Sequence, residues 1–211
     1  EAELQKGLTY TIDGVIAKPL IEEKCEIVAN AFKRYKEIQL TYGDDFKEFK
    51  KAKEELNKRL KELNHELNQL LHKQASGLKY EAWLQSHQPF HWFAEFYEIV
   101  QENGGFDVII GNPPYVVYTA EKSPYKLKDY ATLTCANLYA YCAERSFNIM
   151  NSDGRFGMII PNSSISADKL SPLQRIFIKD KTTWISNYAW RPAKLFEGAN
   201  MLLAIVLSVK G

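Results

Sequence analysis

Apolar residues between positions 20 and 75 recur with the spacing of a single helix face. Intervals of four and three residues run through two series, Ile21, Cys25, Val28, Phe32, Tyr35 and Leu56, Leu60, Leu63, Leu67, Leu70. Pro19 occupies a position favoured at a helix start, and Asp45 with Glu48 forms a capping pattern before the second series. Gly43 and its neighbours interrupt the pattern. We therefore predict an antiparallel helical hairpin over residues 20–75.

The pattern changes after residue 104, where short apolar runs alternate with helical stretches. Phe106–Ile110 is rich in β-branched residues with little alternation, which is typical of a buried parallel strand. Later apolar runs predict strands at 155–160, 184–190 and 201–209. Helical patterns lie near 137–150 and 170–179, and Gly154 is expected to end the first of these helices. This order predicts an α/β fold with a parallel, doubly wound sheet, whose last pair of strands is either parallel or antiparallel.

These patterns divide the chain into four segments. A short strand-like lead over residues 1–19 precedes the helical hairpin at 20–75. A Trp-containing connector follows at 76–103, and the α/β segment occupies 104–211. At 211 residues the chain is long enough for one full α/β domain or for two small ones.

Composition describes an ordinary soluble, folded chain, with 45% hydrophobic and 25% charged residues and a formal net charge of +1. Residues 1–103 carry 15 Lys and Arg against 18 Asp and Glu, whereas residues 104–211 carry 12 against 8. Because the second half is basic, the neutral total does not exclude nucleic acid as a partner. The sequence has no apolar run of about 18 residues, so no membrane span is expected. Its three cysteines are too few for a disulfide framework and indicate a reducing, cytoplasmic setting.

The most informative residues are Asn112-Pro113-Pro114-Tyr115, directly after the run 106–110. Loops at the carboxyl ends of strands bind ligands in open α/β sheets. Two prolines fix the backbone, so that the Asn112 side-chain oxygen and the Pro113 carbonyl can accept hydrogen bonds from one exocyclic amino group. Such bonds direct the nitrogen lone pair toward an electrophile. Tyr115 offers a flat face on which a base can stack, worth about 1–3 kcal/mol. A proline turn that only ends a strand is the simpler alternative.

In this context the sequence resembles a known family. The segment Gly105–Tyr115 resembles the catalytic motif of AdoMet-dependent, amino-directed methyltransferases, specifically adenine-N6 DNA methyltransferases. Residues 137–141 and 154–162 resemble the next motifs of that family, and residues 89–96 resemble the methylase region of fused type IIG restriction–modification enzymes. The resemblance covers about residues 89–210. It implies the carboxyl-terminal half of a Rossmann-like methyltransferase sheet, preceded by the helical hairpin.

The resemblance also implies roles for individual residues. Asn112 and Pro113 would hold the adenine N6 amino group, and Tyr115 would stack on the flipped base. Phe196 matches the place of a second stacking ring, although a plain apolar residue at a strand edge is equally expected there. Pro114 is expected to line part of the AdoMet pocket. The four tetrad residues thus form the implied catalytic set.

One family feature is missing from the sequence. The family binds AdoMet through a Gly-rich turn after its first strand, and no G-x-G follows a strand here. The chain also begins without Met and closes on a strand-like run. We therefore expect part of a larger restriction–modification enzyme, which alone binds AdoMet weakly or not at all and does not methylate. Mg²⁺ is expected only if a nuclease domain exists elsewhere.

Double-stranded DNA is the expected partner. Lys122, Lys126 and Lys128 lie in the loop after the tetrad, where they are placed to meet phosphates. The helical hairpin is also a candidate surface for self-association. Two other functions stay open. Protein-glutamine methyltransferases use the same tetrad to hold an amide nitrogen, and the chain could also be a non-catalytic helical interaction module. The long hairpin favours DNA, and the intact tetrad argues against a purely structural role.

The histidines do not predict a metal site. His65 and His72 are expected on a solvated flank of the second helix. His87 and His91 have the spacing of a helical zinc pair, but Pro89 between them breaks such a helix.

Overall fold

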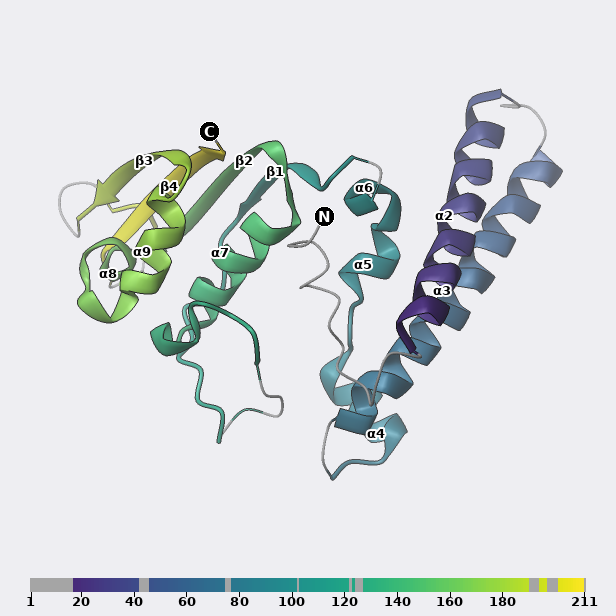
Figure 1. Cartoon of the computed structure of the whole chain (residues 1–211), viewed down its shortest axis with the longest axis horizontal. Coiled ribbons are helices and arrows are strands. Elements are labelled where there is room, and N and C mark those ends of the chain that lie inside the picture. The colour runs from purple at the N-terminus through teal and green to yellow at the C-terminus, as the bar shows by residue number, and fades with distance from the viewer. Residues whose placement is uncertain are drawn as a thin grey trace. The chain divides into compact units, whose positions relative to one another are not determined.

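The structure, a computed structural model, describes residues 17–41, 46–74, 77–101, 103–121, 123, 127–189, 194–196 and 201–210. These residues form two compact units, a helical one within Thr9–Glu102 and one with a sheet within Asn103–Gly211 (Figure 1). Most of the lead predicted over residues 1–19 lies outside the described residues, as does the Asp45 cap. Residues 17–19 of that lead already belong to a helix.

Two long helices, α2 (Ala17–Thr41) and α3 (Phe46–Gln74), pack side by side in the helical unit (Figure 1). Only residues 42–45 separate them, so the two helices run antiparallel. Their apolar faces meet in a core whose buried members include Cys25, Val28, Leu56, Leu63 and Leu67. These residues come from both series with four–three spacing, because such spacing places apolar side chains on one face of a helix.

The segment predicted as a connector contains three short helices, α4 (Tyr80–His87), α5 (Trp92–Glu95) and α6 (Tyr97–Gln101). Trp83 is 2% exposed, and its ring lies 5.4 Å from that of His72 and 5.6 Å from that of His87. His72 is therefore half-buried against an aromatic ring, whereas His65 is exposed, as the predicted solvated flank requires. Ala94 of α5 joins the core of the α2–α3 pair.

The second unit contains a four-stranded mixed sheet in the order β1-β2-β4-β3. Its strands are β1 (Phe106–Gly111), β2 (Met150–Pro161), β3 (Lys181–Tyr188) and β4 (Leu203–Lys210). β1 and β2 are parallel, whereas β4 runs antiparallel to both β2 and β3. The sheet confirms the α/β class and, of the two predicted alternatives, shows the antiparallel last pair.

Helices cover one face of this sheet. α7 (Leu138–Ile149) and α9 (Ser171–Ile178) lie over it (Figure 1). Three short elements, η1 (Leu133–Cys135), α8 (Ser163–Ser166) and η2 (Asp168–Leu170), contact α9. The core beneath contains Phe147 and Phe177 from the two main helices and Phe156 from β2. The rings of Phe147 and Phe156 stack at 4.4 Å between centroids.

The opposite face of the sheet is open in the described residues, so a doubly wound arrangement is not seen there. Ile110, Leu207 and Trp184 form a row across it, with Gly157 between the first two in the register. A Cβ on Gly157 would lie 3.1 Å from Leu207 Cδ2 and 3.3 Å from Ile110 Cγ2, so glycine lets the two side chains close over β2. Ile110 is nevertheless 78% exposed.

The prediction that 106–110 is a buried strand is therefore wrong for this structure. β1 is an edge strand of the described sheet, and Val108 and Ile110 are exposed. Its parallel pairing with β2 agrees with the prediction. The apolar composition of β1 fits a strand with covered faces, whereas the described residues cover only one of them.

The start of β2 also differs from the prediction. The strand begins at Met150, and Gly154, expected as a helix stop, lies inside it. The register between β1 and β2 shifts between Phe106 and Val108. Gly105 has φ +129°, and a Cβ there would lie 2.5 Å from the backbone oxygen of Ile149. Glycine is therefore required at position 105, where the backbone just before β1 lies against the backbone at the carboxyl end of α7.

Candidate active site

Several loops meet at one edge of the sheet. β1, β2 and β3 all have their carboxyl ends at this edge, and β4 starts there, because β4 is antiparallel to both of its neighbours. The tetrad 112–115 follows β1, Asn162 follows β2, and residues 194–196 lie between β3 and β4. Ligands of open α/β sheets bind at such an edge.

The tetrad leaves β1 without regular secondary structure. Asn112 and Pro114 are exposed, Pro113 is buried, and Tyr115 is half-buried. Neither proline has a backbone N–H with which to continue a ladder, and each fixes its own φ. The exposed Asn112 amide is therefore carried on a short, stiff support at the end of the strand.

The Tyr115 hydroxyl is turned toward Asn112. Its oxygen lies 2.5 Å from Asn112 Oδ1 and 3.0 Å from the backbone oxygen of Ile159, and its single proton can be donated to one of them at a time. The ring meets that of Tyr139 on α7 edge to face, with 6.3 Å between centroids. Burial raises the pKa of Tyr115 above its ordinary value of 10.0, so the hydroxyl stays a donor at neutral pH. The Asn112 carbonyl oxygen thus already has a hydrogen-bond partner within the tetrad.

Two backbone hydrogen bonds fix the chain just after the tetrad. Val117 and Asn137 form a single antiparallel bridge. The N–H of Tyr118 donates to the oxygen of Ala136, and the N–H of Leu138 donates to the oxygen of Val116, both at 2.9 Å. The start of α7 is therefore tied to the segment that carries the tetrad.

A buried carboxylate on α7 holds the far end of the same loop. Glu144 accepts hydrogen bonds from the N–H of Ala131 at 2.8 Å, the N–H of Thr132 at 2.9 Å and the Thr132 hydroxyl at 2.6 Å. Glu144 and Thr132 are both buried, where such charge-assisted bonds are strong. Sequence reasoning missed Glu144, because an acidic residue within a helix is ordinarily on the solvated side.

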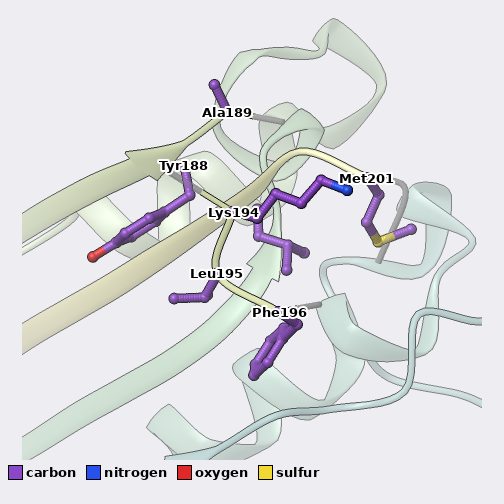
Figure 2. A pocket seen from close by; sticks show the side chains of 7 residues that line it. Tyr188, Ala189, Lys194, Leu195, Phe196 and Met201 are labelled. Atoms are coloured by element: carbon purple, nitrogen blue, oxygen red, sulfur yellow. The ribbon is translucent and has the colours of Figure 1, made fainter. Parts of the chain in front are cut away.

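The second predicted stacking residue lies beside a shallow hollow at the β3–β4 end. This hollow is lined by Tyr188, Ala189, Lys194, Leu195, Phe196, Met201 and Leu203. In Figure 2 the Lys194 side chain extends toward Met201, while the Phe196 ring points away from both. Phe196 is 40% exposed. The fold therefore brings Phe196 to the same edge as the tetrad, with the ends of β2 and β4 between them.

Sequence reasoning also missed a pair of amide side chains at this edge. Nδ2 of Asn162 donates a hydrogen bond of 2.9 Å to Oδ1 of Asn187. In the sequence, Asn162 ends the motif 154–162 and Asn187 lies inside the run 184–190, so neither residue stands out as a site residue. Their proximity depends on the antiparallel placement of β4 between β2 and β3, which the spacing of single residues does not reveal.

The predicted phosphate contacts are only partly described. Lys128 is exposed in the loop between the tetrad and α7. Lys122 and Lys126 lie outside the described residues. The role of all three lysines stays a prediction.

The described residues contain no candidate metal site and no candidate membrane span. Across the described ranges, no group of three or more His, Cys, Asp or Glu side chains could hold a metal ion. No helix within those ranges combines the length and apolarity needed to cross a membrane.

Comparisons with known proteins identify similarity to restriction–modification methylases. The sequence profile described as Eco57I restriction-modification methylase matches residues 12–196. A curated protein of Methanocaldococcus jannaschii, named as a candidate type II restriction enzyme and methyltransferase, is 31% identical over 123 residues. The match covers 57% of this chain and 10% of that protein, so the chain spans about a tenth of the length of this relative. Both findings confirm the resemblance to restriction–modification methylases that the tetrad and its neighbouring motifs suggested.

Proposed function

Because the chain belongs to the Eco57I restriction-modification methylase family, we propose that it carries the catalytic loop of an adenine-N6 DNA methyltransferase of type IIG. The methyl donor in this proposal is S-adenosyl-L-methionine, and the acceptor is an adenine in double-stranded DNA. One observation carries the proposal: an exposed Asn112 amide follows a strand at the ligand-binding edge of the sheet, on two consecutive prolines.

The tetrad can prepare an amino group for methyl transfer. Asn112 Oδ1 and the Pro113 carbonyl accept the two hydrogens of the adenine N6 group. Their pull on both N–H bonds draws the nitrogen lone pair out of conjugation with the ring and makes it available for attack. AdoMet would supply the methyl group: the new N–C bond would form as the bond from its sulfonium sulfur to the methyl carbon breaks, S-adenosylhomocysteine would leave, and the nitrogen would release one proton to solvent. The stiffness of the two prolines keeps the acceptors in place during this step.

Stacking rings would hold the base outside the duplex. Extrusion of the base costs a few kcal/mol, and each stacked base returns about 1–3 kcal/mol. In this proposal Tyr115 supplies one ring and Phe196 the other, from loops at the same edge of the sheet. Stacking requires Tyr115 to leave its hydrogen bond to Asn112, which the amino group of the base then replaces.

The described residues do not by themselves fit the family's AdoMet site. The turns after β1, β2 and β3 contain no glycine-rich run in the part of the chain that the structure describes. Pro114, in the tetrad that follows β1, is the candidate cofactor contact that remains. We infer that further strands beside β1 complete a Rossmann-like sheet, a proposal supported by the exposed Val108 and Ile110.

Substitution of Asn112 tests the proposed function. In the full-length protein, Asn112→Ala removes one of the two acceptors without changing the proline backbone. We expect at least a hundredfold loss of methyl transfer, by analogy with the removal of one preorganised hydrogen-bond partner, about 10²–10³ in rate. The measurement is incorporation of labelled methyl groups from AdoMet into DNA, with the product identified as N6-methyladenine by mass spectrometry.

Asn151→Ala is the matched control. Asn151 donates a hydrogen bond of 2.7 Å to Asp107 at the opposite end of β1 and β2, so its loss should leave the rate unchanged. Unfolding by heat checks that both variants fold. Wild-type activity in Asn112→Ala would refute the assigned role, and methylated glutamine in protein instead of methyladenine would favour the glutamine methyltransferase alternative.

The cofactor part of the proposal has its own test. Because the described residues do not supply the family's glycine-rich turn, this 211-residue chain should bind AdoMet weakly or not at all. Isothermal titration calorimetry measures this directly. Micromolar binding of AdoMet by the chain would contradict the expectation and would show that its own residues form a complete cofactor site.

A further inference from the structure

The hydrogen-bonded pair Asn162–Asn187, here called the amide pair, lies between the two proposed base contacts. Asn162 directly follows β2, and Asn187 is the last residue but one of β3. The strand order places the end of β2 between the end of β1 and the β3–β4 segment. A base that contacts both Asn112 and Phe196 would therefore lie above the end of β2 and the start of β4. The amide pair lies there too, because its hydrogen bond joins the end of β2 to the end of β3.

The backbone of Asn162 is fixed, and its side chain is not used to cap the helix that follows. Its N–H donates to the oxygen of Leu202 at 2.9 Å, and its oxygen accepts from the N–H of Ile165 at 3.1 Å. An Asn before a helix ordinarily turns its side chain onto the first N–H groups of that helix. Here no side-chain cap bond forms to α8, and the amide reaches Asn187 instead.

We propose that the amide pair contacts the target base beside its amino group; this inference rests on the proposed function. The bond from Asn162 Nδ2 to Asn187 Oδ1 leaves Asn162 Oδ1 as an acceptor and Asn187 Nδ2 as a donor. In adenine the N6 amino group is flanked by ring nitrogens that accept hydrogen bonds. Asn112 and Pro113 take the amino hydrogens, and Asn187 Nδ2 donates to one of the flanking ring nitrogens.

This contact would add selectivity that the tetrad lacks. Two acceptors alone hold any exocyclic amino group, whether it is part of a base or of a side-chain amide. A donor beside them additionally requires an unprotonated ring nitrogen next to that amino group. Asn162 positions the donor through its bond to Asn187, and Asn187 makes the contact with the substrate.

Base analogues without one ring nitrogen test the contact. The probes are short labelled single strands that contain adenine, 1-deazaadenine or 7-deazaadenine, so that no duplex has to open. The wild-type full-length protein should bind adenine about tenfold more tightly than one of the two analogues, the effect of one well-placed hydrogen bond. Asn187→Ala should bind all three strands alike, and so should Asn162→Ala, in which the donor is no longer oriented. Fluorescence anisotropy gives the dissociation constants.

Two further variants make the result decisive. Asn187→Asp keeps the size of the side chain and replaces the donor with an acceptor, so the preference for adenine should reverse. Asn151→Ala, at the opposite end of the sheet, should keep the wild-type preference. A variant of Asn187 that folds and still discriminates against the same analogue would overturn the proposal, as would a wild-type protein that binds all three strands equally.

The outcome is separable from that of the proposed function. Failure of the wild-type protein to form N6-methyladenine would refute the reaction, while loss of discrimination in Asn187→Ala would still support the base contact. Conversely, active methyl transfer together with unchanged discrimination in Asn187→Ala would refute the contact alone.

Discussion

At the scale of single residues, the tetrad contains both the proposed substrate acceptor, Asn112 Oδ1, and the hydroxyl group of Tyr115 that is hydrogen-bonded to it. The Tyr115 hydroxyl is bound to Asn112 Oδ1, so the arrangement is satisfied without a ligand. The sequence predicted that the tetrad Asn-Pro-Pro-Tyr directly follows a strand. The bond between Tyr115 and Asn112 could not be predicted in this way, because it depends on the path of the backbone through Pro113 and Pro114 and on the packing of Tyr115 against Tyr139.

Replacement of Tyr115 by Phe tests whether this bond competes with substrate. Tyr115→Phe keeps the ring for stacking but removes the hydroxyl that occupies Asn112. Since a hydrogen bond of this kind contributes about 0.5–1.5 kcal/mol net, we expect KM for DNA to fall by about threefold to tenfold, with kcat changed by less. Methyl-transfer kinetics of the full-length protein measure both constants.

Tyr141→Phe provides the matched control for this experiment. The Tyr141 hydroxyl donates to the backbone oxygen of Leu133 at 3.1 Å, away from the tetrad. Its removal should lower the free energy of unfolding by about 1 kcal/mol and leave KM for DNA unchanged. A rise of KM in Tyr115→Phe would show instead that the hydroxyl helps to bind the substrate.

At the scale of elements, periodicity predicted helices and strands well where one face is apolar. The helices α2 and α3 follow the four–three spacing, because that spacing is a property of the helix itself. Burial of β1 was predicted wrongly, because an apolar strand shows only that it suits covered faces, not which residues cover them. The short helices α4, α5 and α6 were missed, since each is too short to repeat a pattern.

The buried His91, which directly precedes helix α5, gives a testable pH dependence of stability. His91 is 4% exposed, and its Nε2 lies 2.7 Å from Asn68 Oδ1 on α3. Burial lowers the pKa of His91 below 6.5, although the nearby Glu95 carboxylate acts in the opposite direction. The unfolded chain therefore binds the extra proton, and the free energy of unfolding should fall as pH drops through about 6.5.

Urea unfolding of the chain, followed by circular dichroism on both sides of pH 6.5, measures this dependence. His91→Gln removes the titrating group and keeps an N–H donor for Asn68, so its stability should fall less on acidification. An equal fall in the variant and the wild-type protein would assign the acid sensitivity to other groups.

At the scale of the whole molecule, two units with different chemistry share one chain. One is an all-helical unit from the acidic half, and the other is an α/β unit from the basic half that carries the tetrad. The division was visible in the sequence because both periodicity and charge change near residue 104. The order of the strands was not, since it depends on which distant segments pair, yet that order brings the tetrad, the amide pair and Phe196 to one edge.

The open face of the sheet gives the last prediction. Ile110, Leu207 and Trp184 form an exposed apolar row, and such a surface that reaches the edge strand of the described sheet promotes association. We expect this 211-residue chain to self-associate, and Ile110→Lys to reduce that association with little change in the free energy of unfolding. Sedimentation velocity over a range of concentrations measures the first quantity, and urea unfolding measures the second.

Ile109 supplies the control for Ile110→Lys, because adjacent residues of a strand face opposite sides of the sheet. Ile109 packs against the core beneath α7 and α9, so Ile109→Lys should destabilise the chain by about 2–4 kcal/mol. Association that persists unchanged in Ile110→Lys would point to the α2–α3 hairpin as the associating surface. If instead Ile110→Lys destabilises this chain as much as Ile109→Lys, the face is covered within the chain itself. The inference that further strands and helices complete the sheet beside β1 would then lose its support.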